Sequence, residues 1–411
     1  MDSQLTEQLK CPPPQQEVML ARLPIYNSRM DVIGYELLFQ PPGGSNKKAN
    51  PTAATAQVIA ATLLEFGFGQ SVNNRKAFIN VTPAFIDVIA EVQLPPHQVV
   101  LCLPDNFIAD SQLIAKLEVL RSLRYGLSIA GLDSLKNKRL LQIASIFRVD
   151  VKKLNTKQLN TITKFLQSYK NIALQALKIE TMEEYHTYCD KGFNYLQGPF
   201  LGKPSAYVSR NLSTNKLAIL QLLATVHNPD TSVQDLEQLI SCDASLSYKL
   251  IKLINASFFG VQNEVDSIKQ AIVLLGRDEI RKWVSLLALG GMSDEPVAVM
   301  EIAILRAKMC ELLAQKAKLQ QDMYFTVGMF SALDILMKQP IKSILASLPL
   351  SGVIKAAILE KQGILGDALT CALAVENAQW ADINFENLNH TDISDVYRQA
   401  IHWTENMLRR F

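Results

Sequence analysis

The first half of the chain alternates between two hydrophobic patterns. Short apolar, β-branched runs occupy 19–25, 32–39, 77–81, 98–103, 127–132, 145–151, 171–177 and 195–201. Between them lie segments such as 113–120 and 159–166, in which apolar residues recur with helical spacing. Strands that alternate with helices at this spacing are typical of parallel strands joined by helical crossovers. Eight such strands are enough to close a barrel, so the pattern predicts an α/β barrel.

The pattern changes near residues 205–214. Beyond this point, apolar residues recur with helical spacing almost to the last residue, as at 217–223, 246–254 and 272–275, and strand-like alternation is scarce. We therefore predict an all-helical domain after the barrel. The predicted organisation is a disordered tail at 1–17, a barrel domain at 18–204, a linker at 205–214 and a helical domain at 215–411. Within the barrel domain, 41–48 reads as a loop and the Ala-rich segment 52–66 as a helix.

Composition narrows the classes of function. The 411 residues are 48% hydrophobic, which is enough for two large cores. The 41 basic and 39 acidic residues give a net charge of +2, which offers no electrostatic argument for a nucleic-acid or membrane partner. No apolar run reaches about 18 residues without a charge. Six scattered cysteines form no Cys-x-x-Cys pair, so we expect no zinc site and a reducing, cytoplasmic location.

Candidate chemistry gathers where the predicted strands end. In parallel α/β barrels, the loops that follow the strands form the active site. The side chains at these ends are Glu36, Asn80, Cys102, Asp133, Arg148, Leu177 and Gln197. Only Glu36, Asn80 and Asp133 offer the hard oxygen atoms that Mg²⁺ or Mn²⁺ prefers, and they are weak candidates for metal ligands. Structural polar groups at strand ends are an equally good interpretation of Glu36 and Asn80.

Three motifs give the barrel a family resemblance. Tyr-Glu-Leu-Leu at 35–38, Phe-Ile-Asn-Val at 78–81 and Gln-Gly-Pro-Phe at 197–200 resemble the EAL domain of cyclic-di-GMP phosphodiesterases. The resemblance covers about 185 residues and implies a TIM-like (β/α) barrel of EAL type. It matches the family's metal glutamate to Glu36, its metal asparagine to Asn80 and its late glutamine to Gln197.

The other positions of the EAL pattern carry different residues. The phosphate-binding arginine of the family matches Gln40. The Glu-x-x-Glu motif matches Cys102 and Asp105, and the Asp-Asp pair leaves the single carboxylate of Asp133. The catalytic lysine matches Arg148. The last glutamate motif keeps Glu180 but has Leu177 in its metal position. The resemblance thus implies a degenerate EAL domain with no catalytic residue set, and no cofactor is expected unless residual activity needs Mg²⁺ or Mn²⁺.

The helical half resembles an HDOD domain, a relative of HD-type phosphohydrolases. The matching stretches are 243–246, 252–260, 267–272, 275–276, 325–336 and 348–351. Where HD hydrolases carry a metal-binding His-Asp pair, this chain has Ser331-Ala332. None of its five histidines belongs to a His-Asp dipeptide, so we expect no catalysis by this domain.

Three functions fit these expectations. The first is an adaptor whose silent barrel and HDOD domain bind protein partners in a bacterial second-messenger pathway, which the resemblance connects with motility and biofilm control. The second is a receptor that binds cyclic-di-GMP or another nucleotide without hydrolysis. The third is a residual phosphodiesterase. Whether the chain forms a homodimer is left open.

Overall fold

The structure is a computed structural model. It describes residues 19–40, 75–81, 94–105, 110–201, 230–242, 244–255, 265–290, 297–319, 323–348 and 350–408, with isolated positions at 72, 86, 89, 219, 222–223, 225–228 and 321. The expected tail at 1–17, loop at 41–48, helix at 52–66 and linker at 205–214 lie outside the described residues.

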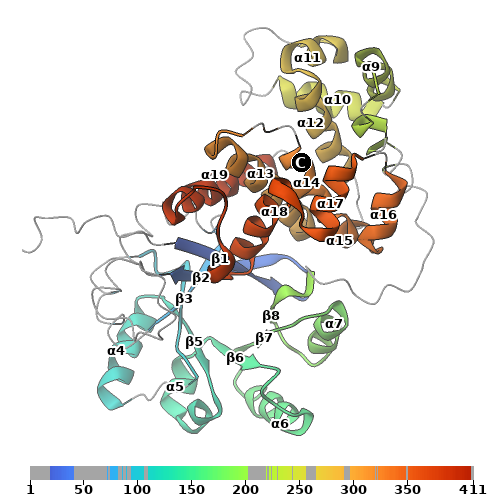
Figure 1. Ribbon diagram of the computed structural model, residues 1–411. Helices are drawn as coiled ribbons and strands as arrows, with labels where there is room; N and C mark the ends of the chain where they lie inside the picture. Colours follow the sequence, from blue (N-terminus) through green and yellow to red (C-terminus); the bar gives the residue numbers. More distant parts are fainter. Residues whose placement is uncertain are drawn as a thin grey trace, which may run out of the picture.

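The first half of the chain forms the predicted closed barrel (Figure 1). Its eight strands follow one another around the barrel in sequence order. They are β1 (Met19–Asn27), β2 (Val32–Gln40), β3 (Lys76–Asn80), β4 (Val99–Cys102), β5 (Gly126–Ala130), β6 (Ile146–Asp150), β7 (Ala173–Leu177) and β8 (Tyr195–Gln197). Each coincides with one of the eight apolar runs, because buried parallel strands read as continuous hydrophobic segments.

Helices separate the later strands, as predicted. They are α4 (Ser111–Ser122), α5 (Lys138–Ile143), α6 (Thr156–Leu166) and α7 (Met182–Asp190). Each begins after a residue whose side-chain oxygen accepts a hydrogen bond from a backbone N–H of the first turn, namely Asp110, Asn137, Asn155 and Thr181. Such N-caps satisfy donors that have no partner within the helix, which fixes where each helix begins.

The first strand departs from a regular (β/α) barrel. β1 runs antiparallel to both of its neighbours, β2 and β8, whereas the other neighbouring strands pair in parallel. The cause is a tight turn at Asn27–Asp31, in which the Asn27 side chain accepts hydrogen bonds from the backbone N–H groups of Arg29 and Asp31. A chain that reverses within so few residues can only pair antiparallel.

Inside the barrel, apolar and polar side chains occupy different levels. Ile25, Phe78, Val100, Cys102 and Ile146 form a buried cluster of their own, separate from the main core. Because side chains alternate along a strand, Asn80 and Arg148 point to the same side as Phe78 and Ile146 and lie two residues further along. The barrel therefore has an apolar floor and a polar mouth where the parallel strands end.

The second half of the chain is helical. Its helices are α9 (Val233–Ser241), α10 (Ala244–Ile254), α11 (Ile268–Leu275), α12 (Arg277–Gly290), α13 (Val297–Lys316), α14 (Tyr324–Phe330), α15 (Leu333–Met337), α16 (Ile341–Ser347), α17 (Gly352–Glu360), α18 (Gly363–Glu376) and α19 (His390–Leu408). The long helix α13 is largely buried and packs against α14, α18 and α19. Among the described residues, no helix has both the length and the apolar character that are needed to cross a membrane.

The two halves meet at the first hairpin of the barrel. β1 contacts α18 and α19, and these helices lie over the β1–β2 face in Figure 1. At this contact Tyr35 of β2 donates a 2.5 Å hydrogen bond to Glu301 of α13, and Arg22 of β1 forms ion pairs with Glu301 and Glu405 at 3.5 and 3.6 Å. The Arg22 side chain is only 2% exposed. Buried charges at this contact therefore depend on partners from the other half of the chain.

Candidate functional site

The polar mouth of the barrel is organised around the carboxylate of Glu36. Asn80 donates from Nδ2 to Glu36 Oε1 at 2.8 Å, and Gln197 donates from Nε2 to Glu36 Oε2 at 2.5 Å. Arg148 Nη1 lies 3.8 Å from Glu36 Oε1 and also donates to Asn80 Oδ1 at 3.3 Å. These four residues, each of which was a candidate from the sequence, come together from β2, β3, β6 and β8. Each oxygen of Glu36 thus accepts a hydrogen bond from a neighbouring amide.

Gln175 extends this network and was missed in the sequence analysis. Its Nε2 donates to Gln197 Oε1 at 2.9 Å, and its side chain is almost fully buried. A signal for it existed, because Gln175 is a polar residue inside the apolar run 173–177 and lies two residues before Leu177 on the same face of the strand. The hydrogen-bonded chain therefore runs from Gln175 through Gln197 to Glu36. Arg148 is fixed from the other side by donating from Nη2 to the backbone oxygen of Leu103 at 2.7 Å.

Two glycines allow the strand ends to approach one another. Gly198 follows Gln197 with φ of 154°, and a Cβ there would lie 2.0 Å from the backbone oxygen of Ile179. Gly131 follows β5 with φ of 82°, and its Cβ would lie 2.4 Å from the backbone oxygen of Asp105. Any larger residue at either position would push the loops apart. The Gln-Gly pair at 197–198 is thus a structural requirement of the mouth as well as a motif.

Cys102 and Leu177 stand at strand ends but bring no ligand chemistry. Cys102 is buried in the apolar floor, and burial raises the pKa of its thiol to about 11. A protonated, soft sulfur atom does not suit Mg²⁺ or Mn²⁺. Leu177 lies half-buried at the end of β7, in register with Gln197 and Asp150 of the neighbouring strands. The side chain of Gln40 lies outside what the structure describes.

The remaining acidic candidates make other contacts. Asp133 lies in an exposed 3-10 helix (Leu132–Lys136) after β5, and its carboxylate accepts a 2.7 Å hydrogen bond from Lys136. Asp105 pairs with Lys153 at 2.7 Å. Glu180 is half-buried just before α7, where its backbone N–H donates to Glu184. Asp133 and Asp105 thus contact lysines that lie outside the hydrogen-bonded network around Glu36.

The described residues of the mouth do not fit a pair of divalent metal ions. Such ions need several carboxylate or amide oxygens with free lone pairs. The network contains one carboxylate, Glu36, whose oxygens already accept hydrogen bonds from two amides, and the guanidinium of Arg148 adds a positive charge beside it. Among the described residues, no three His, Cys, Asp or Glu side chains gather closely enough to hold a metal ion. We therefore derive no hydrolytic step through metal ions here.

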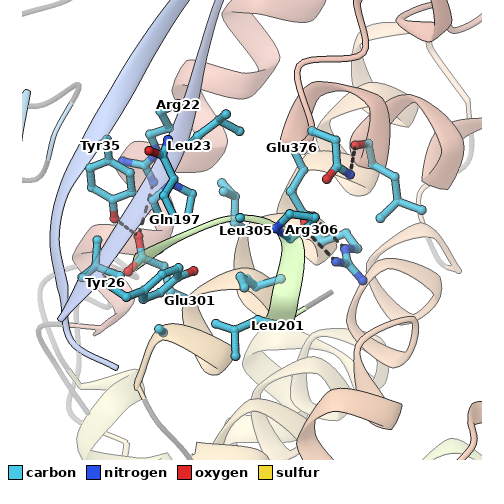
Figure 2. A pocket seen from close by; sticks show the side chains of 18 of the residues that line it. Arg22, Leu23, Tyr26, Tyr35, Gln197, Leu201, Glu301, Leu305, Arg306 and Glu376 are labelled. Carbon is cyan, nitrogen blue, oxygen red and sulfur yellow. Dashed lines mark hydrogen bonds and ion pairs between the residues drawn. The ribbon is translucent and has the colours of Figure 1, made fainter. Parts of the chain in front are cut away.

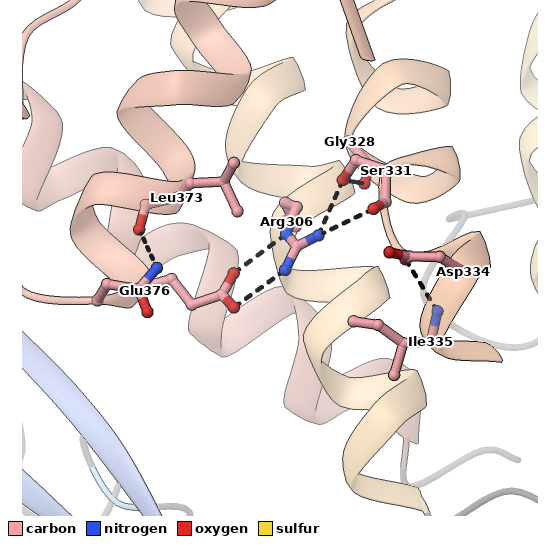
Figure 3. Close-up of polar contacts among 8 residues, drawn as sticks. Arg306, Gly328, Ser331, Asp334, Ile335, Leu373 and Glu376 are labelled. Atoms are coloured by element: carbon pink, nitrogen blue, oxygen red, sulfur yellow. Dashed lines mark hydrogen bonds and ion pairs between the residues drawn. The ribbon is translucent and has the colours of Figure 1, made fainter. Parts of the chain in front are cut away.

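In the helical half, an arginine contacts the residue at the expected His-Asp position. Arg306 of α13 donates from Nη1 to the Oγ and backbone oxygen of Ser331, at 3.0 and 3.3 Å (Figure 3). Its Nε and Nη2 donate to the two carboxylate oxygens of Glu376 at 3.1 and 3.0 Å. Arginine has no lone pair to offer a metal and stays positively charged at any ordinary pH. A fixed internal cation thus lies beside Ser331.

The other titratable groups near these helices are also held in structural roles. Asp334 is largely buried, burial raises the pKa of its carboxyl group, and one of its oxygens accepts a hydrogen bond from the N–H of Ile335. The ring of His227 contacts Ser285 at 2.8 Å and packs edge-on against Phe330. Burial, with a smaller contribution from Arg281, lowers the pKa of His227 to about 4. At neutral pH this ring is therefore uncharged.

Comparison with known proteins agrees with this two-part architecture. The family model of the HDOD domain matches residues 212–341. The protein YuxH of Bacillus subtilis (strain 168) is 28% identical over 408 residues, which cover 95% of this chain and 99% of YuxH. A protein named cyclic di-GMP phosphodiesterase CdgJ, from Vibrio cholerae, is 28% identical over 404 residues, which cover 95% of this chain and 93% of CdgJ.

Both relatives align across the barrel and the helical domain together. The chain thus contains an HDOD domain and is similar to both proteins over nearly its whole length. A solved structure of a standalone EAL protein from Vibrio cholerae O395, in its c-di-GMP-bound form, is 17% identical and covers 46% of this chain and 93% of that one, with a TM-score of 0.35. The expected fold class, a closed barrel followed by a helical HDOD domain, is confirmed.

Proposed function

We propose that this protein is an adaptor in cyclic-di-GMP signalling and that its barrel does not hydrolyse the nucleotide. The observation that carries the proposal is the closed hydrogen-bond network around Glu36. Glu36 is the one carboxylate of this network, Asn80 and Gln197 donate to its two oxygens, and Arg148 lies beside it, where a phosphodiesterase would need several metal ligands. The protonated thiol of Cys102 supplies no substitute. The name of the relative CdgJ connects the family with the nucleotide and makes a direct test of hydrolysis necessary.

The helical domain offers a surface for a protein partner. Tyr248 of α10 and Val273 and Leu274 of α11 are large apolar residues that stand exposed, Val273 with 78% of its surface. α10 and α11 pack against each other, so these side chains belong to neighbouring helices. Exposed aromatic and aliphatic residues on adjacent elements are typical of protein-binding surfaces. An adaptor would use these side chains to bind its protein partner.

A nucleotide receptor is the second candidate, because the mouth keeps one charged group that could meet a phosphate. The guanidinium of Arg148 is 8% exposed and makes its hydrogen bonds to Asn80 and a backbone oxygen. A ligand phosphate would have to compete with these internal contacts. This competition favours the adaptor over the receptor.

Calorimetric titration of the full chain with cyclic-di-GMP, with and without Mn²⁺, separates the candidates. The mixtures are then analysed by chromatography for the linear dinucleotide. The adaptor predicts neither saturable heat nor product. Binding without product that Arg148→Ala abolishes would instead establish the receptor, with Arg139→Ala on the exposed face of the barrel as the matched control. Linear product that is lost in Glu36→Ala would contradict the proposal and establish a phosphodiesterase.

The partner surface is tested separately. Full-length protein is immobilised and used to capture proteins from a bacterial lysate, and it is compared with the double variant Val273→Asp/Leu274→Asp. The adaptor predicts that a specific partner is retained by the native chain and by the control Val119→Asp, an exposed position on α4, and is lost from the double variant. Sedimentation of the purified chain shows whether that partner is a second copy. Retention of the same partners by all three proteins would contradict the proposal that the exposed residues of α11 bind the partner.

A further inference from the structure

A cavity of about 560 Å³ lies where the first hairpin of the barrel meets the helical domain (Figure 2). One wall comes from β1, β2 and the segment after β8, and the other from α13, α18 and α19. Its volume falls within the range of about 300–1,000 Å³ of sites that bind small molecules, and such sites are frequent at domain interfaces. The cavity is separate from the apolar floor of the barrel and is not used by the function proposed above.

The walls of this interdomain cavity are mainly apolar. Leu23, Leu201 and Leu305 line it together with the rings of Tyr26 and Tyr35. Tyr26 and Tyr35 are both buried, and burial raises the pKa of each phenol, so their hydroxyl groups stay protonated. A planar, largely apolar ligand would contact aliphatic side chains and aromatic rings here.

Four charged residues line the cavity, Arg22, Glu301, Arg306 and Glu376, and two more, Arg75 and Glu405, pair with them from outside its lining. Arg22 and Arg75 pair with Glu301, Arg22 also pairs with Glu405, and Arg306 pairs with Glu376. Each arginine at this interface therefore has a carboxylate partner, and the three positive charges equal the three negative ones. Bringing an ion into this low-polarity space would leave its charge without compensation. The cavity is therefore suited to an uncharged ligand.

One carboxylate oxygen in the wall lacks a hydrogen-bond donor. Glu301 is 8% exposed at its side chain, and its Oε1 accepts hydrogen bonds from Tyr35 and Arg22. Its Oε2 is buried and makes no hydrogen bond, since Arg75 Nη1 approaches only to 3.6 Å. A buried acceptor without a donor is unfavourable, so a partner for it is expected. Because Glu301 lines the cavity, a ligand in the cavity can supply this donor.

We propose that this interdomain cavity binds an uncharged, planar heteroaromatic molecule that donates an N–H group to Glu301. The size and chemistry fit a purine base or nucleoside. Such a ligand contacts both halves of the chain and therefore stabilises their docked arrangement. The proposal uses neither Glu36 nor Arg148, although Gln197, which donates to Glu36 in the barrel mouth, also lines the cavity.

The test uses the full chain with adenosine and guanosine as uncharged probes. Binding is measured by saturation-transfer NMR and by the rise in melting temperature at a probe concentration of about 1 mM. Two variants disable the site in different ways. Glu301→Gln removes the carboxylate, and Leu305→Phe fills the cavity without changing a charge. Leu359→Phe, on the exposed face of α17, is the control.

We expect at least one nucleoside to bind saturably and to raise the melting temperature. Affinity should fall about tenfold or more in Leu305→Phe, with native circular dichroism, and stay unchanged in Leu359→Phe. Glu301→Gln should weaken binding in the same way where it folds. Absence of binding by both nucleosides would overturn the proposal, and so would binding that is unchanged in Leu305→Phe. Neither result bears on cyclic-di-GMP at the barrel mouth, which is tested with Arg148→Ala.

Discussion

The carboxylate of Glu36 shows how neighbouring side chains decide the role of a single residue. In isolation, a glutamate at the end of a barrel strand is a candidate metal ligand or base. Here Asn80 and Gln197 donate to its two oxygens, and the nearest charge is the guanidinium of Arg148. The same carboxylate thus acts as the acceptor that holds three strand ends together. Its main measurable contribution should be to stability.

Glu36→Gln is expected to lower the free energy of unfolding by about 1–3 kcal/mol, because the largely buried Arg148 loses its counter-charge and one amide loses its acceptor. Urea denaturation followed by circular dichroism measures the change. Glu118→Gln removes the partner of Arg139 in an exposed ion pair and should cost less than about 1 kcal/mol. Equal effects of the two substitutions would mean that the network contributes nothing beyond a surface pair.

Cys102 should be chemically inert in the folded protein. Burial raises its thiol pKa to about 11, so very little thiolate exists at pH 8. Cys242 is exposed and should react before Cys102. Brief treatment with iodoacetamide, followed by mass spectrometry of peptides, should find label on Cys242 and none on Cys102. In denaturant both should react, and early labelling of Cys102 in the native protein would contradict its place in the barrel floor.

At the level of helices and strands, hydrophobic periodicity predicted much of the fold. All eight strand runs were found because buried strands produce continuous apolar segments. The antiparallel direction of β1 was not predicted, although the polar turn at 27–31 between two strands was visible. Most of the mouth was predicted from its position at strand ends, but Gln175 was missed because it lies two residues before the end of β7. The cavity and its charges could not be predicted, since Arg22 and Glu301 meet only through domain docking.

His227 contacts two other helices, through Ser285 of α12 and Phe330 of α14, and its buried ring should make this packing sensitive to acid. Its pKa is about 4 when folded and near 6.5 when exposed. Between these values the unfolded chain binds a proton that the folded chain does not. Stability should therefore be full above pH 6.5 and fall as the pH drops toward 4, by up to about 3 kcal/mol.

His227→Gln keeps a hydrogen-bonding group near Ser285 and removes the titration. Urea midpoints measured at pH 7 and at pH 4.5 should differ less in this variant than in the native protein. His402→Gln, at an exposed position of α19, should retain the full pH dependence. If the urea midpoint of His227→Gln falls between pH 7 and pH 4.5 as much as that of the native protein, other groups cause the acid sensitivity.

On the scale of the whole molecule, docking of the two domains is governed by buried charge. Arg22 projects from the barrel toward Glu301 of α13 and Glu405 of α19, and its guanidinium stacks over the ring of Tyr35 at 4.4 Å. Charges buried in this way hold the domains in one relative orientation, because any shift would leave them unpaired. An adaptor with this interface would present its barrel and its helices as one rigid body.

Arg22→Ala should destabilise the docked arrangement by about 3–5 kcal/mol, because the buried carboxylates of Glu301 and Glu405 both lose the guanidinium of Arg22, and Arg75 remains as a cation beside Glu301 alone of the two. We expect the variant to unfold in two steps and to be cut by protease between the domains. Arg139→Ala on the barrel surface is the control and should cost about 0–1 kcal/mol. A single cooperative transition at the native midpoint in Arg22→Ala would show that packing alone holds the domains.

The contact between Arg22 and Glu301 also has a consequence for synthesis on the ribosome. The two residues are 279 positions apart. At typical translation rates of about 5–20 residues per second, the hairpin waits roughly 15–60 s after it emerges before its partner on α13 has been made. During that interval the face of the nascent barrel that later packs against the helical domain is exposed to solvent. A chain that terminates early within the helical domain would therefore release a barrel whose interface with that domain is exposed and prone to association. Cellular quality control would recognise such a chain at its first hairpin.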